Sequence, residues 1–233
     1  MRSSVWSALG NTYVVVEPAP GRALEPVQVR KLAGDSDGVV EVVLVADAAL
    51  DIVIWNPDGS QAELSGNGTR IAAAWLAERS GAHRISVHVG AREVVATVLE
   101  SGEIEQDLGE VEVGSREVVA GIALVPVSVG NPHAVVVGDP AEIGRVGPLL
   151  ETHPRFPERT NVQVVRIDGP GEVTARVWER GVGETSSSGT SAVAVAAATH
   201  DAGKVLVHFP GGSLRVRLES GRAHLTGPAE RLR

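Results

Sequence analysis

The sequence predicts an α/β protein built from two similar halves. Most of the chain consists of short runs rich in Val, Ile and Thr that end at Gly, Pro, Asn or Asp, as the strands of half-buried sheets do. Two Ala-rich segments, Gly68–Arg79 and Thr190–Thr199, have the length and apolar character of buried helices. Each follows a similar stretch rich in Gly and hydroxyl side chains, which indicates an internal repeat with a period of about half the chain.

The predicted strands fall into two groups, one in each half of the chain. Those of the first half are Thr12–Glu17, Val39–Ala46, Asp51–Asn56, Ile85–Val89 and Glu93–Leu99. Those of the second half are Ala123–Val129, His133–Val137, Val162–Ile167, Glu172–Trp178, Val205–Phe209 and Ser213–Leu218. Weaker helical patterns cover Pro26–Ala33 and Pro140–Leu150. Because Gly109–Gly121 separates the two groups, we expect domains at 1–115, carrying Ser65, and 116–233, carrying Ser188, with the last strand free to return to the first domain.

Composition excludes several classes of function. The formal net charge of −8 and the lack of a basic cluster argue against a nucleic-acid partner. No run approaches the roughly 18 apolar residues of a membrane span, and no secretory signal is recognisable, so we expect a cytoplasmic protein without a membrane partner. The absence of cysteine excludes disulfides, thiolate metal sites and a cysteine nucleophile. The seven histidines lack the spacing of a metal site, so we expect no metal.

The starts of the two Ala-rich helices are candidate anion sites. A helix N-terminus presents unpaired backbone N–H groups and a partial positive charge, and glycine lets a ligand approach the backbone closely. Ser65 precedes Gly66 and Asn67 in the first half, and Ser188 precedes Gly189 and Thr190 in the second. Either serine alone would fit an ordinary helix cap. The repetition of the pattern favours a functional site.

Other polar residues follow predicted strands and are weaker candidates. Glu179 and Arg180 would suit the ammonium and carboxylate groups of an amino acid, although the same pair would also fit a surface ion pair. Asn131 and His133 lie in a Gly-Asn-Pro-His turn. Asparagine also stands beside a strand at three further positions, where each would alone fit a turn: Asn11, Asn56 and Asn161.

Taken together, these segments resemble the diaminopimelate epimerase family nearly from end to end. In the first half the resembling stretches are Gly10–Val15, Asp37-Gly38, Asn56–Ser60 and Ala62–Arg70. In the second half they are Gly130–Ala134, His153–Pro157, Arg159–Val162, Glu179–Thr185, Ser188–Thr190, Pro210–Gly212 and Thr226–Ala229. Many matches in the same order make this resemblance far more specific than any single motif.

The resemblance implies two pseudo-symmetric α/β domains, each a barrel-like sheet around a central helix, with the substrate in the cleft between them. It implies a cofactor-independent epimerase of lysine biosynthesis that inverts the α-carbon of diaminopimelate, and a homodimer. In the family two cysteines act from opposite faces of that carbon, and Ser65 and Ser188 occupy their positions. The resemblance places substrate-binding groups at Asn11, Asn56, Gly66, Asn67, Asn131, Asn161, Glu179, Arg180, Gly189 and Thr190.

Two departures from the family pattern affect the chemistry. The loop before Asp37 looks shorter than the family's glycine-rich stretch, which helps to close over the substrate. Both thiols are also missing: a thiol has a pKa of about 8.5, which a helix N-terminus lowers, whereas a serine hydroxyl is a much weaker acid and a poor general base without help. His133 is the motif histidine that we consider as a possible assisting group.

Three readings stay open on the sequence alone. The first is an amino-acid epimerase in which the serines work with help, or in which serines have replaced the cysteines of an active enzyme. The second is a related lyase or racemase, since one-sided proton removal needs no acid on the opposite face. The third is a protein that binds an amino acid without turnover. The retained Asn and Glu-Arg motifs favour the epimerase.

Overall fold

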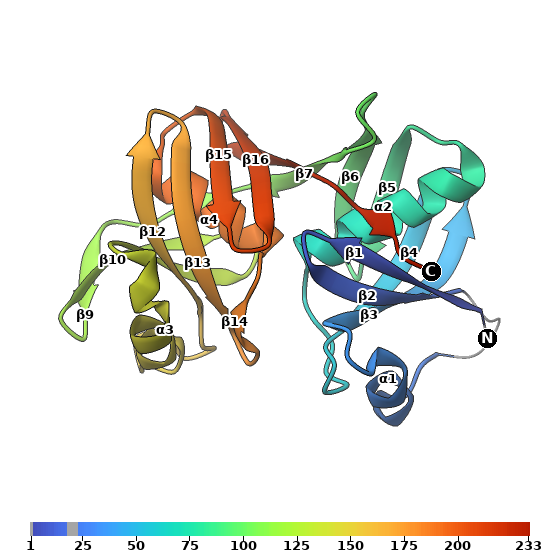
Figure 1. The fold of residues 1–233 in the computed structure, drawn as a ribbon, viewed down its shortest axis with the longest axis horizontal. Coiled ribbons are helices and arrows are strands. Elements are labelled where there is room, and N and C mark those ends of the chain that lie inside the picture. Colours follow the sequence, from blue (N-terminus) through green and yellow to red (C-terminus); the bar gives the residue numbers. More distant parts are fainter. Residues whose placement is uncertain (1, 18–22) are drawn as a thin grey trace. The chain divides into compact units, whose positions relative to one another are not determined.

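The computed structural model describes residues 2–17 and 23–233 and divides the chain into two compact units (Figure 1). Unit 1 comprises Met1–Asp107 and Thr226–Arg233, and unit 2 comprises Leu108–Leu225. The chain therefore passes from one unit to the other twice, after Asp107 and after Leu225. The first crossing lies a few residues before the boundary at 115/116 that the sequence predicts.

The described part of unit 1 contains two helices and a sheet in which sequential strands are neighbours. The helices are α1 (Pro26–Ala33) and α2 (Gly66–Ser80). The strands are β1 (Ser3–Ala8), β2 (Asn11–Val16), β3 (Gly38–Ala46), β4 (Ala49–Trp55), β5 (Arg84–Val89), β6 (Arg92–Val98), the first part of β7 (Ile104–Glu110), the last part of β17 (Arg222–Gly227) and β18 (Glu230–Arg231).

Unit 2 repeats this plan with two α-helices and a short 3-10 helix. The helical segments are the 3-10 turn η1 (Pro140–Glu142), α3 (Ile143–Glu151) and α4 (Gly189–Thr199). The strands are β8 (Glu112–Val113), β9 (Glu117–Val119), β10 (Ile122–Ser128), β11 (Pro132–Val137), β12 (Asn161–Gly169), β13 (Glu172–Glu179), β14 (Gly183–Thr185), β15 (Gly203–Phe209), β16 (Gly212–Glu219) and most of β17.

The two units have the same strand order and pairing. In unit 1, β1–β2 is antiparallel, β2–β3 parallel, β3–β4 antiparallel, β4–β5 parallel and β5–β6 antiparallel. In unit 2, the series β10, β11, β12, β13, β15 and β16 repeats these relations in turn. Even the irregularities correspond, because β3 shifts register between Val42 and Leu44 and β12 between Ile167 and Gly169. This repetition confirms the predicted pseudo-symmetry.

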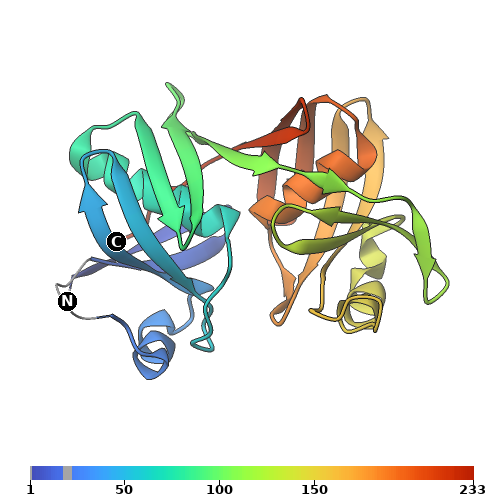
Figure 2. The same ribbon diagram turned by 180° about the vertical axis from the view of Figure 1, so that it is seen from behind.

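Each unit has one helix at its centre. Helix α2 contacts every strand from β1 to β6, and α4 contacts β10, β11, β12, β13, β15 and β16. Figure 2 shows α4, in orange, lying against the strands of its own unit. Both helices are buried nearly all round over much of their length, with buried residues running from Gly66 to Leu76 and from Gly189 to Ala196. A helix of this kind needs strands on all sides, which is the predicted α/β architecture of a sheet around a central helix.

The remaining helices cover the outside of each sheet. Helix α1 packs on β2 and β3, and α3 packs on β12 and β13. Val29 and Ala33 of α1 join a small apolar cluster around Trp55, and Ile143 and Leu150 of α3 join another around Phe156. Among residues 2–17 and 23–233, no helix is long and apolar enough to span a membrane.

Candidate active site

The start of α2 is built around Ser65. Ser65 has extended backbone angles and its Oγ accepts a hydrogen bond from the Gly68 N–H at 3.1 Å, so it caps the helix. Gly66, Asn67 and Gly68 follow in the buried first turn. A Cβ at Gly68 would lie 3.1 Å from the Ile54 side chain of β4, so a larger residue would need that side chain to shift. The helix start therefore lies close against the sheet.

A fully buried arginine supports this helix start. Arg70 donates from Nε to the Pro228 carbonyl at 2.9 Å and from Nη2 to Asn67 Oδ1 at 2.8 Å, while its Nη1 has no hydrogen-bond partner among the described residues. Burial lowers the pKa of Arg70 to about 10, against an opposing electrostatic effect of Tyr13. Arg70 therefore stays charged at neutral pH. It adds a positive charge to the helix N-terminus, where the macrodipole is also positive.

Tyr13 of β2 contacts Ser65 directly. The Tyr13 Oη lies 3.1 Å from Ser65 Oγ. Its strand is fixed by Asp37, whose Oδ2 accepts hydrogen bonds from the Thr12 N–H at 2.7 Å and the Thr12 hydroxyl at 3.1 Å. The resembling stretches around Thr12 and Asp37 thus meet in space and hold a tyrosine against the candidate catalytic serine.

Two of the predicted asparagine sites of unit 1, Asn11 and Asn56, lie at opposite ends of strands. Asn11 is the first residue of β2 and is buried. Asn56 follows β4, and its Nδ2 donates to Ser60 Oγ at 2.9 Å. Hydrogen bonds from Ser60 also hold the pKa of the Asp58 carboxyl below its usual value. Asn56 is therefore part of a well-ordered turn that leads toward Ser65.

The start of α4 in unit 2 carries Ser188, Gly189 and Thr190, all of them buried. Ser188 has the extended backbone of a cap residue, and its carbonyl accepts from the Ala192 N–H at 3.0 Å. Unlike Ser65, it makes no side-chain capping hydrogen bond. Its hydroxyl is therefore not committed to the helix backbone.

A chain of hydrogen bonds runs beneath this helix start. Asn131 Nδ2 donates to Thr190 Oγ1 at 3.4 Å, and Asn131 Oδ1 lies 2.9 Å from His133 Nε2. The other ring nitrogen, Nδ1, lies 3.0 Å from Gln163 Nε2, which also donates to Ser191 Oγ at 2.9 Å. Both imidazole nitrogens thus face amide groups. The structure places His133 in a supporting network, with neither ring nitrogen hydrogen-bonded to a serine.

The environment keeps His133 neutral. Burial lowers its pKa to about 3, the charge of Arg180 acts in the same direction, and the hydrogen bond with Gln163 opposes them only in part. A neutral imidazole can donate from one nitrogen and accept at the other, as the two amides require. His133 therefore positions Asn131 and Gln163 around the start of α4.

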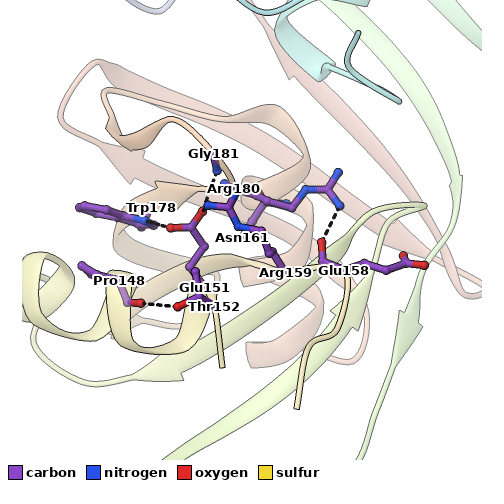
Figure 3. Close-up of polar contacts among 9 residues, drawn as sticks. All are labelled: Pro148, Glu151, Thr152, Glu158, Arg159, Asn161, Trp178, Arg180 and Gly181. Carbon is purple, nitrogen blue, oxygen red and sulfur yellow. Dashed lines mark hydrogen bonds and ion pairs between the residues drawn. The ribbon is translucent and has the colours of Figure 1, made fainter. Parts of the chain in front are cut away.

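Asn161 holds the Glu179-Arg180 turn in place (Figure 3). Its Oδ1 accepts from the Arg180 N–H and its Nδ2 donates to the Pro132 carbonyl, both at 3.0 Å. Arg180 Nη1 donates to the Glu158 carbonyl at 3.2 Å, and Glu179 Oε1 accepts from the Thr185 hydroxyl at 2.6 Å. The predicted residues Asn161, Glu179 and Arg180 therefore form one structural group.

Glu151 at the end of α3 contacts the same turn (Figure 3). Its carboxylate accepts from Trp178 Nε1 at 2.8 Å and from the Gly181 N–H at 2.7 Å, and it forms an ion pair with Arg159. Burial raises the pKa of Glu151, but these donors and the Arg159 charge outweigh burial and bring the net pKa below its usual value. Glu151 is therefore an anion that anchors the Glu179-Arg180 turn.

The sequence alone does not reveal the residues that support these helix starts and turns. Tyr13, Arg70 and Glu151 lie in or beside the resembling stretches, but only the structure shows their partners. Gln163, like Gln106 in unit 1, is an amide on a strand whose side chain faces the central helix, and Gln106 lies 2.7 Å from the Thr69 hydroxyl. In residues 2–17 and 23–233, no three His, Asp or Glu side chains are grouped as metal ligands would be.

Comparison with known proteins identifies the family. The family model for diaminopimelate epimerase matches residues 3–114 and 125–232. The chain belongs to the diaminopimelate epimerase family. A diaminopimelate epimerase from Desulforudis audaxviator is 37% identical over 95% of this chain and 94% of its own length. One from Pelotomaculum thermopropionicum is 34% identical over 95% and 93%, and one from Synechocystis is 31% identical over 98% and 96%.

Solved structures with lower sequence identity share the fold. A predicted epimerase from Pseudomonas aeruginosa superposes with a TM-score of 0.80 at 18% identity, covering 100% of this chain and 97% of the other. A hydroxyproline epimerase from Agrobacterium vitis gives a TM-score of 0.70 at 15% identity over 99% and 90%. Within the diaminopimelate epimerase family, this chain has serine where the sequence resemblance implies both catalytic cysteines.

Proposed function

We propose that this protein is an amino-acid isomerase that interconverts L,L- and meso-diaminopimelate without a cofactor, by removing and returning the proton at one α-carbon. The observation that carries the proposal is the end-to-end family match, with relatives of that name at 31–37% identity over about 95% of the chain. The half-buried Ser65 and the buried Ser188, at corresponding helix starts, support it.

In the proposed mechanism, Ser65 and Ser188 act on the same carbon from opposite faces. Proton removal leaves an electron pair that spreads into the α-carboxylate, so groups that favour negative charge at that carboxylate lower the barrier. The first turns of α2 and α4, with Gly66, Asn67, Gly189 and Thr190, offer such N–H groups. Asn11, Asn56, Asn131, Asn161, Glu179 and Arg180 would hold the rest of the amino acid.

The proposal includes a small-molecule amino-acid substrate and a role in lysine biosynthesis. It also includes a homodimeric assembly and a cytoplasmic location. They rest on the family and on the sequence resemblance. Size-exclusion chromatography with light scattering would measure the number of chains per particle.

Hydrogen exchange at the α-carbon tests the proposed reaction. The protein is incubated with L,L- or meso-diaminopimelate in deuterium oxide, and NMR and chiral chromatography follow exchange and configuration. Exchange with inversion is expected. Elimination or exchange without inversion would point to a lyase, and saturable binding with no exchange would point to a binding protein.

Restoring the thiols provides the matched comparison. Ser65→Cys combined with Ser188→Cys should raise the exchange rate by about 10²–10⁴-fold, the range that a well-matched acid–base group contributes. Each single variant should gain less, because one face would still carry a hydroxyl. No gain in the double variant would show that diaminopimelate is not the substrate of this site.

A further inference from the structure

The hydroxyl of Ser65 needs a partner if it is to take up a proton. An aliphatic hydroxyl is a weak base, and it becomes effective when a neighbouring group accepts its own proton as it takes another. The Gly68 N–H, which Ser65 caps, is a donor and cannot accept a proton. Tyr13 Oη lies 3.1 Å from Ser65 Oγ and can accept a proton when the phenol is ionised.

The position of Tyr13 is fixed by close packing. Tyr13 is paired with Gly38 across the β2–β3 ladder. A Cβ at Gly38 would lie 2.6 Å from Tyr13 Cε1 and 2.7 Å from the Trp55 carbonyl oxygen, so only glycine leaves room for the ring. With Thr12 held by Asp37 on the same strand, the phenol has little freedom to turn away from Ser65.

The surroundings favour a negative charge on the phenol. Arg70 is fully buried, and its hydrogen-bond acceptors, the Pro228 carbonyl and Asn67 Oδ1, are both neutral. Arg70 and Tyr13 interact electrostatically. Because the positive end of the α2 dipole lies at the same place, a phenolate here would face two sources of positive potential. A phenol, with an ordinary pKa of about 10, is also far easier to ionise than an aliphatic alcohol.

We infer that Tyr13 and Ser65 form a proton relay that takes the place of the missing thiol in unit 1. The inference rests on the proposed function. As the substrate Cα–H bond breaks, its proton forms a bond to Ser65 Oγ, and the proton of Ser65 passes to the Tyr13 phenolate. The electron pair stays on the substrate, in its α-carbon and carboxylate. Tyr13 acts only through Ser65 and is a positioning residue.

Tyr13→Phe tests the relay in the full-length protein, because it removes the hydroxyl and keeps the ring that packs on Gly38. With diaminopimelate in deuterium oxide, kcat for α-hydrogen exchange should fall by about 10²-fold. KM should change by less than about threefold, since Tyr13 acts in the chemical step. Ser4→Ala removes a buried hydroxyl from the neighbouring strand β1 and should leave both constants unchanged.

The same substitution in a Ser65→Cys background separates a chemical role from a structural one. A thiol near a helix N-terminus ionises without a relay, so Tyr13→Phe should then cost less than about threefold. An equal loss in the serine and cysteine backgrounds would overturn the relay, because the tyrosine would then be acting on the structure.

A spectroscopic measurement tests the contact without any substrate. Tyr13 is the single tyrosine of the chain, so tyrosine labelled with ¹³C at Cζ gives one NMR signal. Ser65→Ala should shift this signal, and Ser4→Ala should leave it in place. An unchanged signal in Ser65→Ala would overturn the Tyr13–Ser65 pair. Exchange that survives Tyr13→Phe would overturn the relay alone, whereas no exchange in the wild type would overturn the proposed function and the relay with it.

Discussion

Burial of His133 makes the stability of the folded protein depend on pH. The ring is 1% exposed, and its two nitrogens face Asn131 and Gln163. Its pKa of about 3 in the folded chain lies well below the ordinary value of 6.5. The unfolded chain therefore binds a proton at a pH where the folded chain does not. Acid then favours unfolding, and the effect develops as the pH falls from about 6.5 toward 3.

His133→Gln should make stability less sensitive to acid. Between pH 7 and pH 5 the unfolding free energy of the wild type should fall by about 2 kcal/mol because of His133. Glutamine does not titrate, so this loss should be absent in His133→Gln. Urea unfolding at both pH values measures the difference. His224→Gln, at a half-buried position on β17, is the control. Equal losses in the wild type and His133→Gln would contradict the prediction.

The two candidate catalytic serines should differ in their effect on stability. Ser65 Oγ accepts from the Gly68 N–H, whereas Ser188 makes no side-chain capping bond. Ser65→Ala should therefore destabilise the protein by about 1 kcal/mol, the usual value of a cap, and Ser188→Ala by clearly less. Denaturant unfolding of the two variants at pH 7 checks this. A larger cost at Ser188 would contradict the prediction.

At the scale of elements, sequence patterns predicted the helices better than the edges of the sheets. The range Pro26–Ala33 is α1 as observed. The predicted helix Pro140–Leu150 divides into η1 and α3, since the chain turns more tightly over its first residues. The strand β1 was missed because its polar serines hide a pattern of alternating burial. The alternation is evident only once β2 and β18 are beside it.

The sequence predicts those parts of the candidate site that lie in recognisable motifs. The positions of Ser65, Ser188 and Asn161 follow from the repeat and the family resemblance. Their supports do not, because Glu151 and Gln163 are ordinary polar residues until the fold brings donors to them. A buried carboxylate or amide is recognisable only from its partners, and those partners lie far away in the sequence.

Glu151→Gln should loosen the junction between α3 and the Glu179-Arg180 turn. It removes the charge that faces Arg159 and weakens the hydrogen bonds from Trp178 and Gly181, so unfolding free energy should fall by about 1–3 kcal/mol at pH 7. Because the pKa of Glu151 is lowered in the folded state, its contribution is present above the usual carboxyl value of 4.5 and is lost as the pH falls further.

The matched control for that variant is Glu142→Gln, just before the same helix. Glu142 pairs with Arg145 on the surface, and such pairs contribute roughly 0.5 kcal/mol or less. Denaturant unfolding at pH 7 and pH 4 should show a gap between the two variants that narrows at the lower pH. A gap that is constant with pH would contradict the assignment of Glu151 as an anion in the fold.

At the scale of the whole molecule, the division into units is not a division of the chain into two consecutive pieces. Residues Thr226–Arg233 belong to unit 1. There β18 pairs with β1 through Trp6 and Ser7, and the Pro228 carbonyl accepts from the buried Arg70. Unit 2 is one continuous segment with its own apolar cluster around Leu150 and Phe156.

Deletion of residues 226–233 should therefore destabilise unit 1, although unit 2 is the unit that directly precedes these residues in the sequence. Arg70 would lose the acceptor of its Nε while remaining buried, which should cost about 1–3 kcal/mol, and β1 would lose a neighbouring strand. Hydrogen–deuterium exchange with mass spectrometry should show faster exchange in β1 and α2 than in α4. Uniform acceleration across both units would contradict this expectation.

The tie between Arg70 and Pro228 also has a consequence for synthesis on the ribosome. Unit 2 is complete in sequence as soon as its last strand has emerged, whereas unit 1, although translated first, lacks its final strand until the residues beyond 225 appear. Unit 1, which is translated first, can therefore complete its fold only after unit 2 has been translated. Until then, Arg70 lacks the acceptor of its Nε, and β1 lacks the strand β18 that pairs with it.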